Sequence, residues 1–140
     1  MLGFIAGASV VRRDSFFEAG GFHPRFGVGG EEQLLAIDLV DRGWTLVYAE
    51  DIVAYHHPSS RRDPDARSKI LVRNDLWIIW LRRPVLTAAR RTWRCARQAL
   101  RDSRIAGGLA AAAWGLPWII RERKEAGTRV QVCLELLEGG

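Results

Sequence analysis

The sequence predicts an α/β fold over residues 1–62, followed by a basic, tryptophan-rich helical tail over residues 63–140. Three observations lead to this division. In the first part, short apolar runs typical of buried strands alternate with helical periodicity. In the second part, long segments repeat apolar and basic residues at helical spacing. A polar stretch, "PSSRRDPD" at residues 58–65, separates the two.

The first part begins with an apolar run, residues 4–12, which predicts a buried strand. Asp14 is placed to cap a short helix over residues 15–19. A glycine-rich loop leads into a helix over residues 31–42, which has a broad apolar face and is ended by Gly43. The remaining apolar runs, at residues 44–50 and 52–57, predict two short strands.

The second part predicts a succession of helices. Residues 66–83 are rich in Leu, Ile and Trp, and Pro84 ends that segment. The next helix, residues 85–102, carries arginines at helical spacing, with apolar residues expected on the opposite face. Two more helical segments follow, at residues 105–125 and 130–137.

Composition narrows the class of protein. Of the 140 residues, 48% are hydrophobic and 26% charged, which favours a globular chain over a disordered one. The net charge of +5 suggests an anionic partner such as phospholipid, nucleic acid or a phosphorylated substrate. The two cysteines lack a Cys-x-x-Cys spacing, so a zinc site or disulfide framework is not expected. No apolar stretch is long and uninterrupted enough to predict a transmembrane helix.

Two adjacent carboxylates, Glu31 and Glu32, follow the glycine-rich loop directly. Acids in the first turn of a helix interact favourably with its dipole, by about 0.3–1 kcal/mol each. This alone could explain the pair. A glycine loop also lets a ligand approach the backbone closely, and such loops often carry function. Spacing alone therefore leaves a capping role and a catalytic role both open.

Three motifs and a variable loop between the first two resemble a known family in their order. They are "GASVVRRDSFFEAGGF", a variable loop, "GGEEQLLAIDLVDRGW" and "VYAEDIVAYHH", which together span about residues 3–60. The order is similar to that in the C-terminal half of the catalytic domain of inverting family 2 glycosyltransferases, which have the GT-A fold. The resemblance implies a partial GT-A segment that transfers sugar from a nucleotide-sugar donor to an acceptor hydroxyl. It also implies a role in the synthesis of cell-envelope polysaccharide or glycolipid.

The resemblance implies a role for each matching residue. Glu32 would be the general base and Glu31 its acidic neighbour, because an inverting transfer needs a carboxylate to deprotonate the acceptor hydroxyl. His56, with His57 as the alternative, would help to ligate a divalent cation, Mg or Mn, that neutralises the leaving nucleoside diphosphate. The loop residues expected to line the acceptor side are Phe22, Arg25, Phe26, Gly29 and Gly30.

The chain departs from the family pattern in ways that bear on activity. Its acidic pair is Glu-Glu instead of Glu-Asp, and His23 stands where an aspartate is usual. Its one Asp-x-Asp, at residues 63–65, follows the predicted strands instead of preceding them. The nucleotide-binding half of the fold, which carries that metal-binding motif, is expected ahead of residue 3. We therefore expect the 140-residue chain to be a fragment, a mis-started frame or a short protein that is inactive alone.

The basic tail suggests a location. Its tryptophans favour a lipid interface, and its arginines favour an anionic surface. We therefore expect a cytoplasmic protein that lies peripherally on the inner face of the cell membrane. Nucleic acid is less favoured, because no recognised nucleic-acid-binding motif appears. The alternative to an enzyme is a non-catalytic protein that binds a membrane surface or nucleic acid through this basic helical face.

Overall fold

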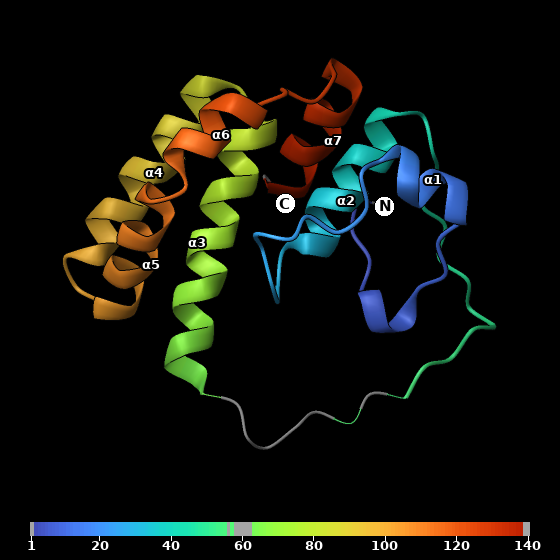
Figure 1. Cartoon of the computed structure of the whole chain (residues 1–140), viewed down its shortest axis with the longest axis horizontal. Coiled ribbons are helices and arrows are strands. Elements are labelled where there is room, and N and C mark those ends of the chain that lie inside the picture. Colours follow the sequence, from blue (N-terminus) through green and yellow to red (C-terminus); the bar gives the residue numbers. More distant parts are fainter. Residues whose placement is uncertain (1, 56, 58–62, 139–140) are drawn as a thin grey trace. The chain divides into compact units, whose positions relative to one another are not determined.

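The computed structural model describes residues 2–55, 57 and 63–138, and it is built from helices (Figure 1). Helix accounts for 63% of these residues, and none of them forms a strand. The predicted α/β class, and with it a GT-A sheet segment, is therefore wrong for this part of the chain.

Among the described residues, the segments predicted as strands find no neighbouring strand to pair with. Residues 4–12 contain only a 3-10 turn, η1 (Ala6–Ala8), and residues 44–55 form no helix or strand. Strand propensity reflects packing and pairing with neighbours, and even an isolated hairpin is marginal in water. The cost is visible in the apolar side chains left exposed, which are Val47, Tyr48, Ile52, Val53 and Tyr55.

The chain divides into two compact units. The first groups residues 1–27, 31–59 and 126–140, and the second groups residues 28–30 and 60–125. Contacts thus place the last segment of the chain with the first unit, which is not apparent when the sequence is read in order. The expected boundary after residue 62 remains a prediction.

The first unit is built around helix α2 (Glu31–Asp41), which contacts α1 (Arg13–Glu18) and α7 (Thr128–Glu138). Leu35 and Leu39 of α2 form a small core with Ala19, at the end of α1. The partly buried side chains packed against this core are Phe4, Val11, Phe16, Trp44 and Leu46. The helix predicted over residues 31–42 is thus confirmed, and it is buried on most of its faces.

Backbone hydrogen bonds close the C-terminal end of α2. The N–H of Gly43 donates to the carbonyl of Val40, and the N–H of Trp44 donates to the carbonyl of Leu39. These bonds satisfy carbonyls that have no partner inside the helix. The carboxylate of Asp41 accepts a hydrogen bond of 2.6 Å from the N–H of Gly127, which holds the start of the last segment to α2.

The second unit is a helical bundle in which α3 (Pro64–Arg82) contacts α4 (Val85–Ala99), α5 (Ser103–Ala113) and α6 (Leu116–Glu122) (Figure 1). Helices α3 and α4 confirm the first two helices predicted for the tail. Helix α5 approaches α3 closely because Gly108 has no side chain. A Cβ atom at that position would lie 2.6 Å from the Cβ of Val72.

Buried polar groups hold this bundle together. The indole of Trp77, in α3, donates a 3.0 Å hydrogen bond to the carbonyl of Ala112 and packs edge-to-face on Trp118. The guanidinium of Arg123 donates to the carbonyls of Trp80 and Arg83, at the end of α3. Since the last carbonyls of a helix have no partner within it, Arg123 closes that end of α3.

Candidate functional site

The acid pair occupies the first two positions of α2, and both side chains are half-buried. Oε2 of Glu31 is buried and accepts no hydrogen bond from the described residues. A buried acceptor without a donor is costly, and its cost is relieved by any ligand that brings a hydroxyl to it. The helix dipole favours the negative charge of both carboxylates at this end. Glu31 is thus placed to accept a hydrogen bond from a ligand.

The loop ahead of the acid pair has a backbone conformation that depends on glycine. Gly29 has φ +90° and Gly30 has φ +93°, values that residues with a Cβ atom rarely adopt. A Cβ atom at Gly29 would also lie 2.6 Å from Cδ2 of Leu71. Substitution of Gly29 would therefore strain the backbone and push against α3 side chains.

Asn74 holds this glycine loop and was not singled out from the sequence. Its amide group, 1% exposed, donates a hydrogen bond to the carbonyl of Gly29 and accepts one of 2.9 Å from Nε of Arg73. Buried amides are rare in apolar helix faces unless they are hydrogen-bonded. The signal in the sequence was weak, because Asn74 lies between Arg73 and Asp75 and its partner lies 45 residues away.

The other loop residues expected on the acceptor side have different environments. Phe26 is fully buried and contacts the ring of His23, so it anchors the loop. Phe22 is 42% exposed and packs edge-to-face on Phe16. The exposed Arg25 donates its backbone N–H to Nδ1 of His23 at 3.3 Å. Phe22 and Arg25 remain accessible to a ligand, whereas Phe26 is not.

The expected metal ligands do not form a site within the described residues. His57 is exposed and belongs to no helix, and His56 lies outside the described residues. No group of three or more His, Cys, Asp or Glu side chains that could hold a metal ion occurs in the part of the chain that the structure describes. The Mg or Mn site thus remains a prediction.

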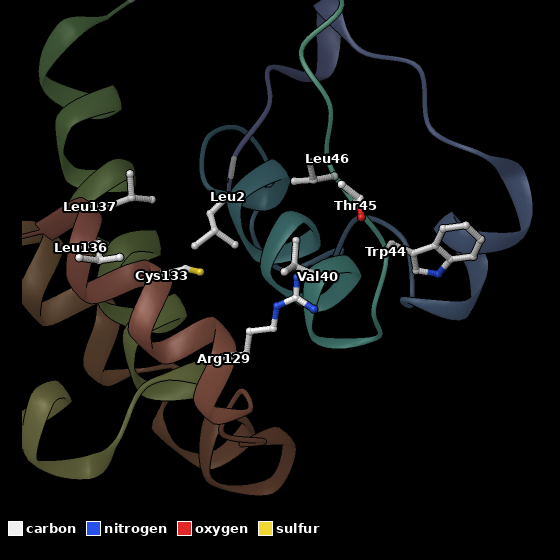
Figure 2. A pocket seen from close by; sticks show the side chains of 9 residues that line it. All are labelled: Leu2, Val40, Trp44, Thr45, Leu46, Arg129, Cys133, Leu136 and Leu137. Atoms are coloured by element: carbon white, nitrogen blue, oxygen red, sulfur yellow. The ribbon is translucent and has the colours of Figure 1, made fainter.

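An apolar pocket lies within the first unit, between α7 and the segment that follows α2 (Figure 2). Arg129 is the only charged residue in its lining. Val40, from α2, is eight residues beyond Glu32, which places the pocket about 12 Å along the helix from the acid pair. The pocket and the acid pair are therefore separate features. Its other lining residues are Leu2, Trp44, Thr45, Leu46, Cys133, Leu136 and Leu137.

Helix α4 presents a surface that differs from the prediction. Ala88 and Cys95 are buried, and Thr92 accepts a hydrogen bond of 3.0 Å from the indole of Trp80. Leu86 is 71% exposed and Trp93 is 67% exposed. Both lie on the same side of the helix as its exposed arginines instead of opposite to them. Small side chains face the bundle because α3 and α5 pack close to α4, and the larger ones are left outside.

No protein-family model, curated protein or solved structure matches this chain. Among the described residues, no helix combines the length and apolar character required to cross a bilayer.

Proposed function

We propose that this chain takes part in the inverting transfer of a sugar from a nucleotide-sugar donor to an acceptor hydroxyl. In this proposal Glu32 is the general base and Glu31 its acidic neighbour. The observation that carries it is the acid pair at the start of α2, with a buried, unpartnered Oε2 on Glu31, directly after a glycine loop. The order of motifs along the sequence supports the same chemistry.

The proposed reaction is a single displacement. The acceptor oxygen attacks the anomeric carbon while the bond from that carbon to the nucleoside diphosphate breaks. The hydroxyl proton passes to the carboxylate of Glu32, and the nucleoside diphosphate leaves with the bonding electrons.

Donor binding is assigned to a polypeptide segment other than these 140 residues, because they contain no glycine-rich phosphate-binding motif and their one Asp-x-Asp, at residues 63–65, caps the start of α3. The chain would supply the base and the acceptor side. A divalent cation, Mg or Mn, bound with the donor would neutralise charge on the leaving diphosphate. The acceptor is proposed to be a glycan or lipid-linked saccharide at the cytoplasmic face of the membrane.

The competing explanation is that both acids only stabilise the start of α2. In that case their removal costs about 0.3–1 kcal/mol each and affects no reaction. The non-catalytic alternative, a protein that binds a membrane or nucleic acid through α4, makes the same prediction for the acids. Stability and transfer must therefore be measured on the same variants.

The test replaces Glu32 with Gln in the gene of the cell that carries this chain. Lysates with membranes are then supplied with radiolabelled nucleotide sugars of the uridine, guanosine and thymidine classes. We expect one donor to label membrane glycan in the wild type, and Glu32→Gln to reduce that labelling by about 10²–10⁴-fold.

The matched control is Glu18→Gln, which removes one exposed carboxylate from α1. It is expected to leave labelling unchanged. The free energies of unfolding of both variants are expected to lie within about 1 kcal/mol of the wild-type value. If a strain that lacks the gene labels as strongly as the wild type with every donor, or if Glu32→Gln labels normally, the proposal is wrong.

A further inference from the structure

The exposed face of α4 combines two rows of side chains that the bundle does not use. Leu86, Trp93 and Leu100 are each more than two-thirds exposed. They are seven residues apart, and seven residues turn an α-helix by about 20° less than two full turns. The three side chains therefore form one apolar row along the outside of α4 and its C-terminal cap.

A row of arginines runs beside these apolar side chains. Arg90, Arg97 and Arg101 are exposed and follow the apolar row at an offset of about 40–100° around the helix. Arg94 extends the same row. Arg91, by contrast, points toward α3, where it pairs with Asp75 at 3.4 Å. The outer face of α4 is thus apolar along one edge and cationic along the other.

The arginines at the end of α4 border a hollow shared with the start of α5. Its cationic lining residues, Arg94, Arg97 and Arg101, have no carboxylate partner within the part of the chain that the structure describes. The one carboxylate in the lining, Asp102, already accepts hydrogen bonds from the backbone N–H and the side chain of Arg104. The lining is completed by Gln98, Leu100 and Ile105.

We propose that this face of α4 binds an anionic phospholipid surface, with a lipid phosphate in the hollow formed by Arg94, Arg97 and Arg101. A guanidinium group can donate two parallel hydrogen bonds to two oxygens of one phosphate. Three guanidinium groups around one hollow therefore offer several such donors to a phosphate. The apolar row would enter the headgroup region, where tryptophan and leucine side chains are favoured. The helix would then lie in the plane of the interface.

The apolar row is what favours lipid over nucleic acid. Arginines alone would serve either polyanion, because both present phosphates. Leu86 and Leu100 can form no hydrogen bond or ion pair with a sugar-phosphate backbone. Burial of their side chains in lipid, by contrast, is favourable in proportion to their apolar area. This inference is independent of the proposed sugar transfer, because it involves no residue of the acid pair or its loop.

The test is flotation of the purified chain with vesicles of phosphatidylcholine, with and without phosphatidylglycerol. We expect binding only to vesicles that contain phosphatidylglycerol, weakened by added salt. Trp93→Ala is expected to reduce partitioning about tenfold. The double variant Arg94→Gln/Arg97→Gln is expected to reduce it roughly thirtyfold, since each charge near such a surface contributes about a factor of five.

Matched controls distinguish binding through this face of α4 from an effect of total positive charge or of any exposed tryptophan. Trp114→Ala removes a tryptophan that is 88% exposed at the end of α5, and Arg67→Gln/Arg121→Gln removes the same charge from exposed positions on α3 and α6. Both controls are expected to bind within about twofold of the wild type. All of these positions are exposed, so circular dichroism should show an unchanged fold.

Three results would overturn the proposal. The first is equal binding to neutral and anionic vesicles. The second is an equal loss of binding in the control and α4 arginine variants, which would indicate charge without a site. The third is tighter binding to duplex or single-stranded DNA than to the anionic vesicles at matched salt, with Trp93→Ala unchanged, which would identify nucleic acid as the ligand.

Discussion

The two units of this chain differ in how their backbone hydrogen bonds are satisfied. In the second unit, long helices α3 and α4 satisfy their own backbone hydrogen bonds and contribute Trp77, Leu81 and Ala88 to the buried interior of the bundle. In the first unit, short helices alternate with residues 44–55, which form no regular structure and expose their apolar side chains. Sequences with comparable apolar content therefore reach different degrees of order.

The difference follows from where each element finds its partners. A helix closes hydrogen bonds within four residues and needs neighbours only to bury one face. A strand closes none of its own and requires another strand beside it. Residues 44–55 carry a strand-forming composition, but the described residues supply no strand to pair with.

Hydrogen exchange should show the largest contrast between the two units. Amides in the interior of α3 are expected to exchange at least about 10³-fold more slowly than those of residues 45–55, which lack helical or strand hydrogen bonds. Mass spectrometry of peptides from the native protein measures both in one sample. Similar protection in the two regions would mean that residues 45–55 are hydrogen-bonded in solution. It would contradict the stated difference between the two units.

A buried and an exposed tryptophan of the second unit provide the next test. Trp77→Ala removes a side chain that is 6% exposed and leaves a cavity against Trp118. The free energy of unfolding should therefore fall by about 3–5 kcal/mol. Trp114→Ala, at a position 88% exposed, should change the free energy of unfolding by no more than about 0.5 kcal/mol. Denaturant titrations followed by circular dichroism measure both. Equal effects would indicate that α3 is not the centre of a packed bundle.

The smallest expected effect concerns the start of α5. Hydrogen bonds from the backbone and then the side chain of Arg104 lower the pKa of Asp102, which caps this helix. A lowered folded-state pKa stabilises the fold above the unfolded value, near 4, and this contribution is lost as pH falls through the folded pKa. Asp102→Ala should therefore lower Tm at pH 7 by about 2 °C.

The difference in Tm between wild type and Asp102→Ala should shrink as the pH is lowered from 5 toward 2. A thermal melt series over that range measures it. A difference that stays constant or grows toward low pH would show that the carboxylate charge does not contribute through this cap.

Helix positions could largely be predicted from the sequence. Periodicity located α2, α3 and α4 to within a few residues, because each has a recurring apolar pattern and a clear end at Gly43 or Pro84. The predicted strands failed, because strand propensity says nothing about whether a partner is present. The prediction that the apolar residues of α4 lie opposite its arginines was also wrong, since small residues face the bundle and large ones are exposed.

The candidate site was predicted in part. Glu31 and Glu32 could be located because acids mark the first turn of a helix after a glycine loop. Asn74 could not, because its hydrogen bond to Gly29 joins residues 45 positions apart. The assignment of Phe26 to the acceptor side remains a prediction, although its ring is fully buried in the core.

By itself the sequence determined the local features of this protein: the helices with strong periodicity, their ends, the basic charge and the position of the acid pair. Each of these depends on residues within a few positions of one another. Tertiary structure alone decided which residues are buried on α4, which asparagine holds the glycine loop, and that residues 44–55 do not form strands. Those features depend on partners far away in the chain, or on their absence among the described residues.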